Sequence, residues 1–220
     1  MAKILKETTT IDLGIKYAGK VSKSITDTFA DRLNNITINA IVTQFAHSPE
    51  GAKIMFMGVG KNSYLSHKLA ATCQSLNINA NYFDSVHAMH GDLGALRSGD
   101  IVIAFSKSGK TAELLHTLAY LKKHKKHFGV TTVGVFASDD DYNSEAVTSM
   151  EITKNTDYQI LLKSCQELDD NKTVPTTSAL VMQAVGDVIA LQIASNNGLT
   201  TEQFGLTHPG GLIGATHNKD

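Results

Sequence analysis

The amino-acid sequence predicts an α/β fold in which helices cover both faces of a parallel sheet. Short apolar runs at residues 53–59, 100–105 and 130–136 have the length and composition of buried strands. The helical spacing of apolar residues follows the first two runs, at 62–76 and 112–126. Strands and helices that alternate in units of this size form parallel sheets with right-handed crossovers, so we expect a single α/β domain.

Further elements are expected on either side of these units. Apolar residues recur at helical spacing from 15 to 47, which predicts one or two amphipathic helices that cover the rest of the chain or a partner subunit. A short strand is expected at 80–83. Residues 149–152 are the candidate for a last short strand.

The last third of the chain is expected to hold a long loop and two helices. Residues 153–174 are polar and irregular, and loops of that length are usually functional or poorly ordered. A long helix is predicted at 176–197. Thr200 is the expected cap of a short helix, with Gln203 three residues later.

Composition excludes several classes of protein. The chain has 220 residues, of which 42% are hydrophobic, enough for a substantial core. Its 20 Lys and Arg residues balance 21 Asp and Glu residues, so the sequence lacks the excess of positive charge that is typical of nucleic-acid-binding proteins. The one basic run, at 122–127, is interpreted as a solvated helix end that suits the helix dipole, with nucleic-acid binding as the minority alternative.

The lack of a recognisable targeting signal and the pattern of the cysteines favour a cytoplasmic protein with no membrane partner. The first 14 residues lack the apolar core of a signal peptide, and no stretch is expected to supply the ~20 apolar residues that span a bilayer. Cys73 and Cys165 have no partner motif, which favours reduced thiols over a disulfide.

The first candidate loop for an anion follows the strand at 53–59. Gly58 and Gly60 allow close backbone approach, the next helix offers free N–H groups, and Lys61 adds a mobile positive charge beside Ser63. The loop lacks the Walker A and GxGxxG spacings. A plain strand-to-helix turn explains it equally well.

The second candidate loop, residues 106–111, carries more information. Ser106, Ser108 and Thr111 gather around one glycine, directly after a strand and before a helix. Hydroxyls and helix N-terminal amides suit a phosphate monoester, whereas the alternative is that these side chains only cap the helix. With two such loops on one sheet, phosphate binding is favoured.

Three other segments hold residue types that can carry chemistry. Thr176 and Ser178 place further hydroxyl groups at the start of the long helix, where they either bind substrate or only cap the helix. The irregular spacing of His and Asp in residues 84–92 argues against a metal site. His208 lies in a rigid turn near the carboxyl terminus, and its spacing alone is typical of a surface residue.

Seven short motifs, in a fixed order from about residue 53 to residue 214, resemble those of the sugar isomerase (SIS) family. Within the family they are most similar to the arabinose 5-phosphate isomerases of the Kdo (3-deoxy-octulosonate) pathway. The most specific are HGDLG, S-x-S-G and HPGG in that order. The motifs are GVGK at 58–61, KLAAT at 68–72, HGDLG at 90–94, SKSG at 106–109, PTTS at 175–178, GD at 186–187 and HPGG at 208–211.

This resemblance implies a fold, an assembly and a reaction. The fold is a five-stranded parallel sheet in a flavodoxin-like α/β/α sandwich, here one SIS domain over 1–220 with leading helices at 1–50 and the core and terminal turn at 51–214. The assembly is a homotetramer. The reaction interconverts ribulose 5-phosphate and arabinose 5-phosphate without a cofactor, for Kdo, lipopolysaccharide or capsule synthesis.

The resemblance also implies roles for individual residues. The family's four functional positions fall on Lys61, Glu113, Glu167 and His208, and the substrate-contacting histidine of HGDLG falls on His90. We expect Glu167 to be the base and His208 to serve ring opening or protonation of oxygen, although the sequence does not assign these roles. The expected substrate-binding residues are Gly60, Ser63, His90, Ser106, Ser108, Thr111, Thr176 and Ser178.

The chain departs from the family pattern at several points. Lys110 stands where the family usually has glutamate, and residues 168–174 replace a small apolar segment. Asp84 stands where the family has a histidine that can bind inhibitory zinc. The usual pair of carboxyl-terminal CBS modules is absent from these 220 residues, so we expect any control to act at the catalytic site, through a product such as CMP-Kdo.

Two rival functions stay open at this level. One is isomerisation of another sugar phosphate, because the expected anchor recognises phosphate rather than sugar. The other is a non-catalytic sugar-phosphate-binding module, as in regulators that contain the SIS domain. Against a regulator, the sequence has no basic helix-turn-helix segment of sufficient length.

Overall fold

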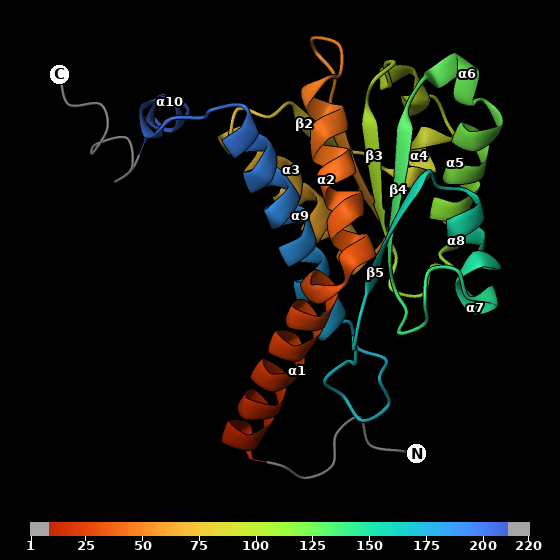
Figure 1. Cartoon of the computed structure of the whole chain (residues 1–220), viewed down its shortest axis with the longest axis vertical. Coiled ribbons are helices and arrows are strands. Elements are labelled where there is room, and N and C mark those ends of the chain that lie inside the picture. The colour runs from red at the N-terminus through yellow and green to blue at the C-terminus, as the bar shows by residue number, and fades with distance from the viewer. Residues whose placement is uncertain (1–8, 211–220) are drawn as a thin grey trace.

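The computed structural model describes residues 9–210 and contains one five-stranded parallel sheet, which confirms the predicted α/β class (Figure 1). The strand order is β2-β1-β3-β4-β5, and every neighbouring pair is parallel. All five strands therefore end at the same edge of the sheet, called here the carboxyl edge. The strands are β1 (Ile54–Gly58), β2 (Ala80–Tyr82), β3 (Ile101–Phe105), β4 (Thr131–Ala137) and β5 (Tyr158–Leu162).

Helices cover both faces of the sheet. One face packs against α1 (Thr10–Ala30), α2 (Arg32–Ala46), α3 (Lys61–Ser75) and α9 (Thr177–Asn196). The other packs against α4 (Ser85–Ala88), α5 (Ala112–Lys123), α7 (Glu145–Thr148) and α8 (Glu151–Lys154). The remaining helical elements are η1 (Asp92–Ala95), α6 (Lys125–Phe128) and α10 (Thr201–Leu206).

The central strands are apolar on both sides because both sides are covered. In β1, Ile54 and Phe56 enter the core under α3 and α9, whereas Met55 and Met57 enter the core under α5. Every residue of β1 and β3 is buried. This explains why these strands are continuous apolar runs rather than alternating patterns.

The leading segment forms two helices that meet at Asp31. The Asp31 carboxylate accepts hydrogen bonds from the backbone amides of Leu33 and Asn34 and so caps α2. The buried Asn34 side chain then bonds both the N–H and the C=O of Leu161 in β5, at 2.8 Å each. The prediction that these helices cover the rest of the chain is thus confirmed for α2.

The predicted strand at 149–152 is wrong, and the fifth strand lies later in the chain. Ser144 caps α7, and Ile152 is a buried residue of the short helix α8. The fifth strand is β5, inside the segment 153–174 for which the sequence predicts a loop. Only three of its five residues are fully buried, because β5 is an edge strand, so its apolar pattern is short.

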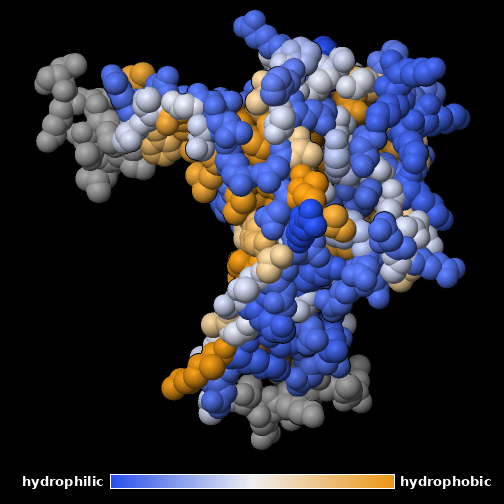
Figure 2. Space-filling view, in the orientation of Figure 1, coloured by the Kyte–Doolittle hydropathy of each residue, from blue (hydrophilic) through white to orange (hydrophobic). Residues whose placement is uncertain are grey.

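Helix α9 corrects the expectation that no segment is apolar enough to span a bilayer. By length and mean hydropathy it qualifies as such a segment among the described residues. In the fold it packs against α1, α2 and α3, and ten of its residues are buried. Its composition is therefore that of a core helix. Figure 2 shows apolar surface along the side that carries α1 and α9, whereas the side of α5 to α8 is mostly hydrophilic.

Candidate functional site

Three helices at the carboxyl edge begin without a side-chain cap. The N-cap residues of α3, α5 and α9 are Gly60, Thr111 and Thr176, and none accepts a capping hydrogen bond on its side chain. Side chains cap α1, α2, α4, α7 and α10, whereas the short helices α6 and α8 also lack a side-chain cap. The alternative that the hydroxyls serve only as caps therefore does not apply to Thr111 or Thr176. Uncapped helix starts are natural anion sites.

The first loop, between β1 and α3, brings the backbone very close to its own helix. A Cβ atom on Gly58 would lie 2.5 Å from the carbonyl oxygen of Asn62, so only glycine fits there. Gly60 has φ of +62°, which also favours glycine. The Ser63 hydroxyl donates to the Gly60 carbonyl at 2.8 Å. Lys61 is exposed and has no hydrogen-bond or ion-pair partner within residues 9–210.

The second loop, between β3 and α5, presents hydroxyls and amides together. The hydroxyls of Ser106 and Thr111 lie 2.8 Å apart, and the Ser108 hydroxyl accepts from the Lys110 amide at 3.2 Å. Within the described part of the chain, the amides of Ala112 and Glu113 have no acceptor. The loop therefore offers a set of donors that a phosphate group can fill.

The two loops lie side by side at the carboxyl edge. Gly58 pairs with Phe105 in the register of β1 and β3, which places the two strand ends next to each other. The Asn62 side chain then donates to the Phe105 carbonyl at 3.2 Å. Lys61, Ser63 and the hydroxyl loop are therefore brought to one part of the molecule, as the sequence predicts for two loops on a parallel sheet.

Glu167 lies at the third helix start, that of α9. Its side chain is fully buried, and its oxygens accept from the backbone amides of Thr176 and Ser178 at 2.9 and 3.2 Å. The hydroxyls of the same two residues also donate to it, and the Lys107 ammonium lies 3.0 Å from Oε1. An internal carboxylate thus occupies the anion position of α9, where the sequence predicts that Thr176 and Ser178 hold substrate.

The environment of Glu167 keeps it charged. Burial by itself favours the neutral acid, but hydrogen bonds from Ser178 and Thr176 and the nearby Lys107 ammonium outweigh that effect and lower the pKa of the carboxyl. Five donors saturate the lone pairs of the two oxygens. In this arrangement Glu167 is a stabilised carboxylate with no free lone pair for a substrate proton.

Glu113 and His90 line one cavity between α4 and the start of α5. The cavity has a volume of about 300 Å³ and is lined by Ser85, Val86, Met89, His90, Glu113 and His116. Glu113 is exposed in the first turn of α5, two residues after Thr111. The structure therefore brings an exposed carboxylate and an imidazole into one cavity beside the start of α5.

His208 lies far from the other predicted site residues of the same chain. Thr207, its neighbour, donates to the carbonyl of Ser75, the last residue of α3, at 3.2 Å. Lys61 begins that 15-residue helix, which is about 22 Å long. Figure 1 shows α10 at the end of the molecule opposite the start of α9. The half-buried His208 ring packs on Phe204 at 4.1 Å between ring centroids, so one chain does not bring it to the other predicted residues.

Two of the motif segments hold helices together. Lys68 in α3 pairs with both carboxylate oxygens of Asp187 in α9, at 2.7 and 2.8 Å. A Cβ atom on Gly186 would lie 2.4 Å from the Leu69 side chain, so glycine permits the close approach of these helices. Nothing in either contact faces the cavity of Glu113, and these motif residues serve packing.

Two residues of this region are not among those predicted from the sequence. Lys107 is the variable residue of S-x-S-G, and its contact with Glu167 joins residues 60 apart in the chain, so no local pattern indicates it. His116 lines the same cavity as Glu113. A signal for His116 does exist in the sequence, because residues three apart on a helix share a face.

The segment at 84–92 does not gather metal ligands. Asp84 caps α4 by accepting from the amides of Val86 and His87, and it also accepts from the Tyr82 hydroxyl at 3.1 Å. Among residues 9–210, no three His, Cys, Asp or Glu side chains are placed to hold a metal ion.

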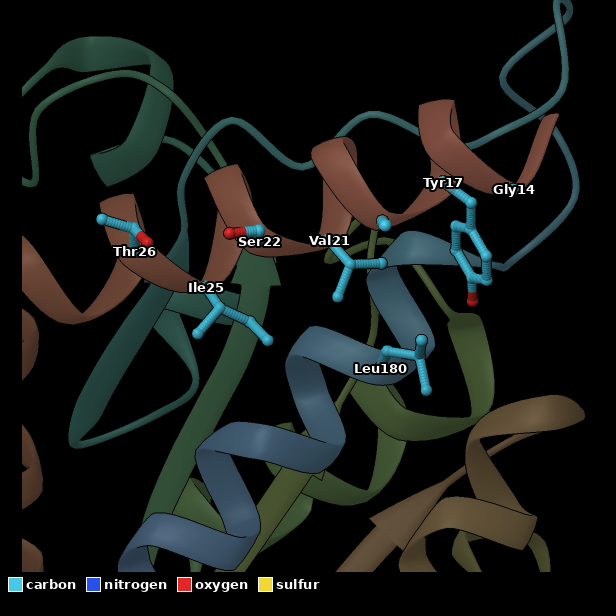
Figure 3. A pocket seen from close by; sticks show the side chains of 8 residues that line it. Gly14, Tyr17, Val21, Ser22, Ile25, Thr26 and Leu180 are labelled. Carbon is cyan, nitrogen blue, oxygen red and sulfur yellow. The ribbon is translucent and has the colours of Figure 1, made fainter. Parts of the chain in front are cut away.

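A second hollow, of about 500 Å³, runs between α1 and the start of α9 (Figure 3). Tyr17, Val21 and Ile25 project from α1 toward α9, where Leu180 lies nearest to Tyr17 and Val21. The lining is mostly apolar and includes none of the predicted site residues. It lacks the convergent polar groups of the carboxyl edge, so it is not the candidate site.

Fold and site together define an α/β protein with a doubly covered parallel sheet and with glycine- and hydroxyl-bearing helix starts at its carboxyl edge. The SIS domain model matches residues 48–166, and the chain belongs to this family. The predicted resemblance and the predicted five-stranded SIS fold are thereby confirmed.

Relatives and a solved structure agree with the family. An uncharacterized protein of Chlamydia pneumoniae is 36% identical over 165 residues, 75% of this chain and 46% of the relative. The arabinose 5-phosphate isomerase KdsD of Pseudomonas aeruginosa is 29% identical over 162 residues, 74% of this chain and 46% of its own length. The chain thus spans about half the length of these curated relatives.

The structure of E. coli CFT073 c3406 in complex with arabinose 5-phosphate is similar to nearly the whole chain. The TM-score is 0.76 at 28% sequence identity, and the match covers 93% of this chain and 100% of that one.

Proposed function

We propose that this chain isomerises a phosphosugar, interconverting D-ribulose 5-phosphate and D-arabinose 5-phosphate through a cis-enediolate. The observation that carries the proposal is the pair of uncapped helix starts beside Lys61, next to a cavity that holds Glu113 and His90. The names of the KdsD relative and of the arabinose 5-phosphate complex support the choice of sugar. A cytoplasmic role in Kdo, lipopolysaccharide or capsule synthesis is part of this proposal.

The phosphate is proposed to bind between the first and second loops. Ser106, Ser108 and Thr111 supply hydroxyls, and the first turn of α5 supplies amides without an acceptor in the described chain. Lys61, exposed and unpaired within residues 9–210, is left for the oxygens at the reacting carbons, at the other end of the sugar from the phosphate. An anchored phosphate then positions the sugar over the neighbouring cavity.

Proton transfer at carbon is proposed for Glu113 rather than for Glu167. A base must reach the proton that it abstracts, and Glu113 is exposed in the cavity with His90. Glu167 has no exposed surface and five hydrogen-bond or ion-pair donors. His90 and Lys61 are then the groups that stabilise the enediolate oxygens.

His208 is proposed to serve the site of a second copy of the chain, in a homotetramer. Within one chain it lies at the opposite end of α3 from Lys61. Its ring nitrogen Nδ1 lies 2.7 Å from the Phe204 carbonyl, which leaves Nε2 to act on a neighbouring copy. Ring opening or protonation of oxygen is the role that this position suits.

The experiment is an assay of the purified chain with ribulose 5-phosphate. We expect arabinose 5-phosphate to appear, with no added metal or cofactor, and to be converted back when supplied alone. Turnover of other ketose phosphates but not of this one would replace the proposed sugar. Binding of sugar phosphates without any turnover would instead favour a non-catalytic module.

A further inference from the structure

One ion pair connects the hydroxyl loop, residues 106–111, to the start of α9. Lys107 belongs to the hydroxyl loop, and its Nζ lies 3.0 Å from Oε1 of Glu167 and 3.5 Å from the Lys172 carbonyl. The Lys107 side chain is 33% exposed, whereas that of Glu167 is fully buried. Lys107 is therefore a charged group in contact with both solvent at the loop and the buried carboxylate.

Glu167 in turn determines how α9 begins. It accepts the amides of Thr176 and Ser178 and so performs the capping that the Thr176 side chain does not. From the other side, Lys20 of α1 donates to the Glu167 backbone carbonyl at 2.6 Å. A carboxylate buried among these groups is stable only while its charge is compensated.

We propose that Lys107 is a positioning residue that holds Glu167 as a carboxylate, and thereby fixes the hydroxyl loop and the start of α9 in one arrangement. Lys107 is the one cation whose ammonium contacts the Glu167 side chain within the described chain. The loop that binds phosphate in the proposed function thus has its geometry tied to the protonation of Glu167. Only the activity measurement below depends on that proposed function.

The surroundings allow the effect to be attributed to Glu167. Of the nearby ionisable groups, the pKa of the Cys165 thiol is raised to about 11 and that of the Tyr17 hydroxyl is raised, in both cases first by burial and then by Glu167 itself. Neither titrates in acid. Lys20 on α1 and Lys172 on the loop of Glu167 are also near the pair. Asp169 on that loop does titrate in acid, with a pKa lowered first by the Thr173 amide, but its hydrogen bonds come from Thr173 and Val174 and not from Lys107, so substitution of Lys107 leaves its partners in place.

The sign of the pH effect follows from the lowered pKa of Glu167. The stability that this carboxylate contributes is present above the pKa of a glutamate in the unfolded chain, about 4.3, and is lost as pH falls through the lower pKa of the folded state. Removing the Lys107 charge raises the folded pKa. The carboxylate then contributes less stability above that pKa, so the protein reaches its acid-unfolding midpoint at a higher pH.

The test compares acid unfolding of Lys107→Met, Lys107→Arg and Lys110→Met with that of the unaltered protein. Lys110 is the matched control, because it is exposed in the same loop and its hydrogen bond to Ser108 comes from the backbone amide. We expect the midpoint of acid unfolding to rise in Lys107→Met, by at most the ~1–3 pH units by which an adjacent opposite charge shifts a carboxyl pKa, and to stay near the original value in the other two. Equal midpoints for Lys107→Met and the unaltered protein would overturn the proposal, as would no rescue by arginine.

A double variant covers the case in which Lys107→Met does not fold. Lys107→Met combined with Glu167→Gln removes both charges, so the buried position no longer holds an uncompensated carboxylate. Folding of the double variant supports charge compensation by Lys107. If Glu167→Gln folds by itself but neither Lys107→Met nor the double variant does, Lys107 acts by packing, and the proposal is overturned.

Activity gives a separate readout. If the isomerase assay succeeds, the acid limb of kcat/KM should move to higher pH in Lys107→Met, in the same direction as the unfolding midpoint, and should return in Lys107→Arg. An unmoved acid limb would contradict the coupling of Glu167 to the loop. If no variant isomerises sugar, the proposed function fails, whereas the unfolding midpoints still decide the role of Lys107.

Discussion

Two glutamates of this chain show how far the surroundings of a residue decide its chemistry. Glu113 is exposed beside His90, whereas Glu167 is fully buried under Lys107 and the start of α9. Both are candidates for catalysis in the sequence. The difference arises from long-range contacts, because Lys107 and Glu167 are brought together only when β3 and β5 join the same sheet.

This contrast predicts that replacing Glu113 by glutamine impairs activity, whereas replacing Glu167 by glutamine impairs stability. Glu113→Gln should lower turnover by about 10²–10⁴-fold, because it removes a positioned base, and should leave stability within about 0.5 kcal/mol because the side chain is exposed. Glu167→Gln should lower the free energy of unfolding by about 1–3 kcal/mol. The NH₂ group of the new glutamine cannot accept the hydrogen bonds that buried donors now make to the carboxylate. Urea unfolding and steady-state assays of both variants check this. A fully active Glu113→Gln would remove the assigned role.

At the scale of elements, α9 is positioned by packing and by one buried carboxylate. Its contact with α3 depends on Gly186, which leaves room for Leu69. The Lys68–Asp187 pair across the same contact is 51% and 33% exposed, and such pairs contribute about 0–1 kcal/mol. The close approach of the helices is therefore held mainly by shape.

Gly186→Ala should destabilise the protein by about 1–3 kcal/mol, because the new methyl group would overlap the fully buried Leu69. Gly19→Ala is the matched control. It also lies within a helix, but a Cβ atom there would meet nothing within 4 Å, so it should stabilise α1 by about 0.5–1 kcal/mol. Thermal unfolding measures both. Equal effects of the two substitutions would show that the α3–α9 contact tolerates the methyl group.

For the whole molecule, the parallel sheet gathers its donors at one edge and leaves His208 at the other end. Strand order places the loops after β1 and β3 side by side. The hydrogen bond from Thr207 to Ser75 holds α10 beyond the far end of α3. If His208 takes part in the reaction, the active assembly has more than one copy.

This arrangement predicts complementation between inactive variants. His208→Ala and Glu113→Gln should each lower turnover by about 10²–10⁴-fold. Co-expressed with different tags and purified as mixed oligomers, they should regain a substantial part of the original activity, because some sites combine an intact His208 with an intact Glu113. Mixtures as inactive as the single variants would place His208 in its own chain's site or in no site. Mixed oligomers of two Glu113→Gln copies serve as the control.

The sequence by itself determined the α/β class, most helices, the strands with long apolar runs and the places of the two strand-to-helix loops. These are local properties, because periodicity, glycines and hydroxyls act within a few residues. Tertiary structure decided the rest: the fifth strand, which has a short apolar pattern at the sheet edge, the saturation of Glu167, and the separation of His208 from Lys61. Each depends on contacts between distant segments, so the pattern of neighbouring residues carries no signal for them.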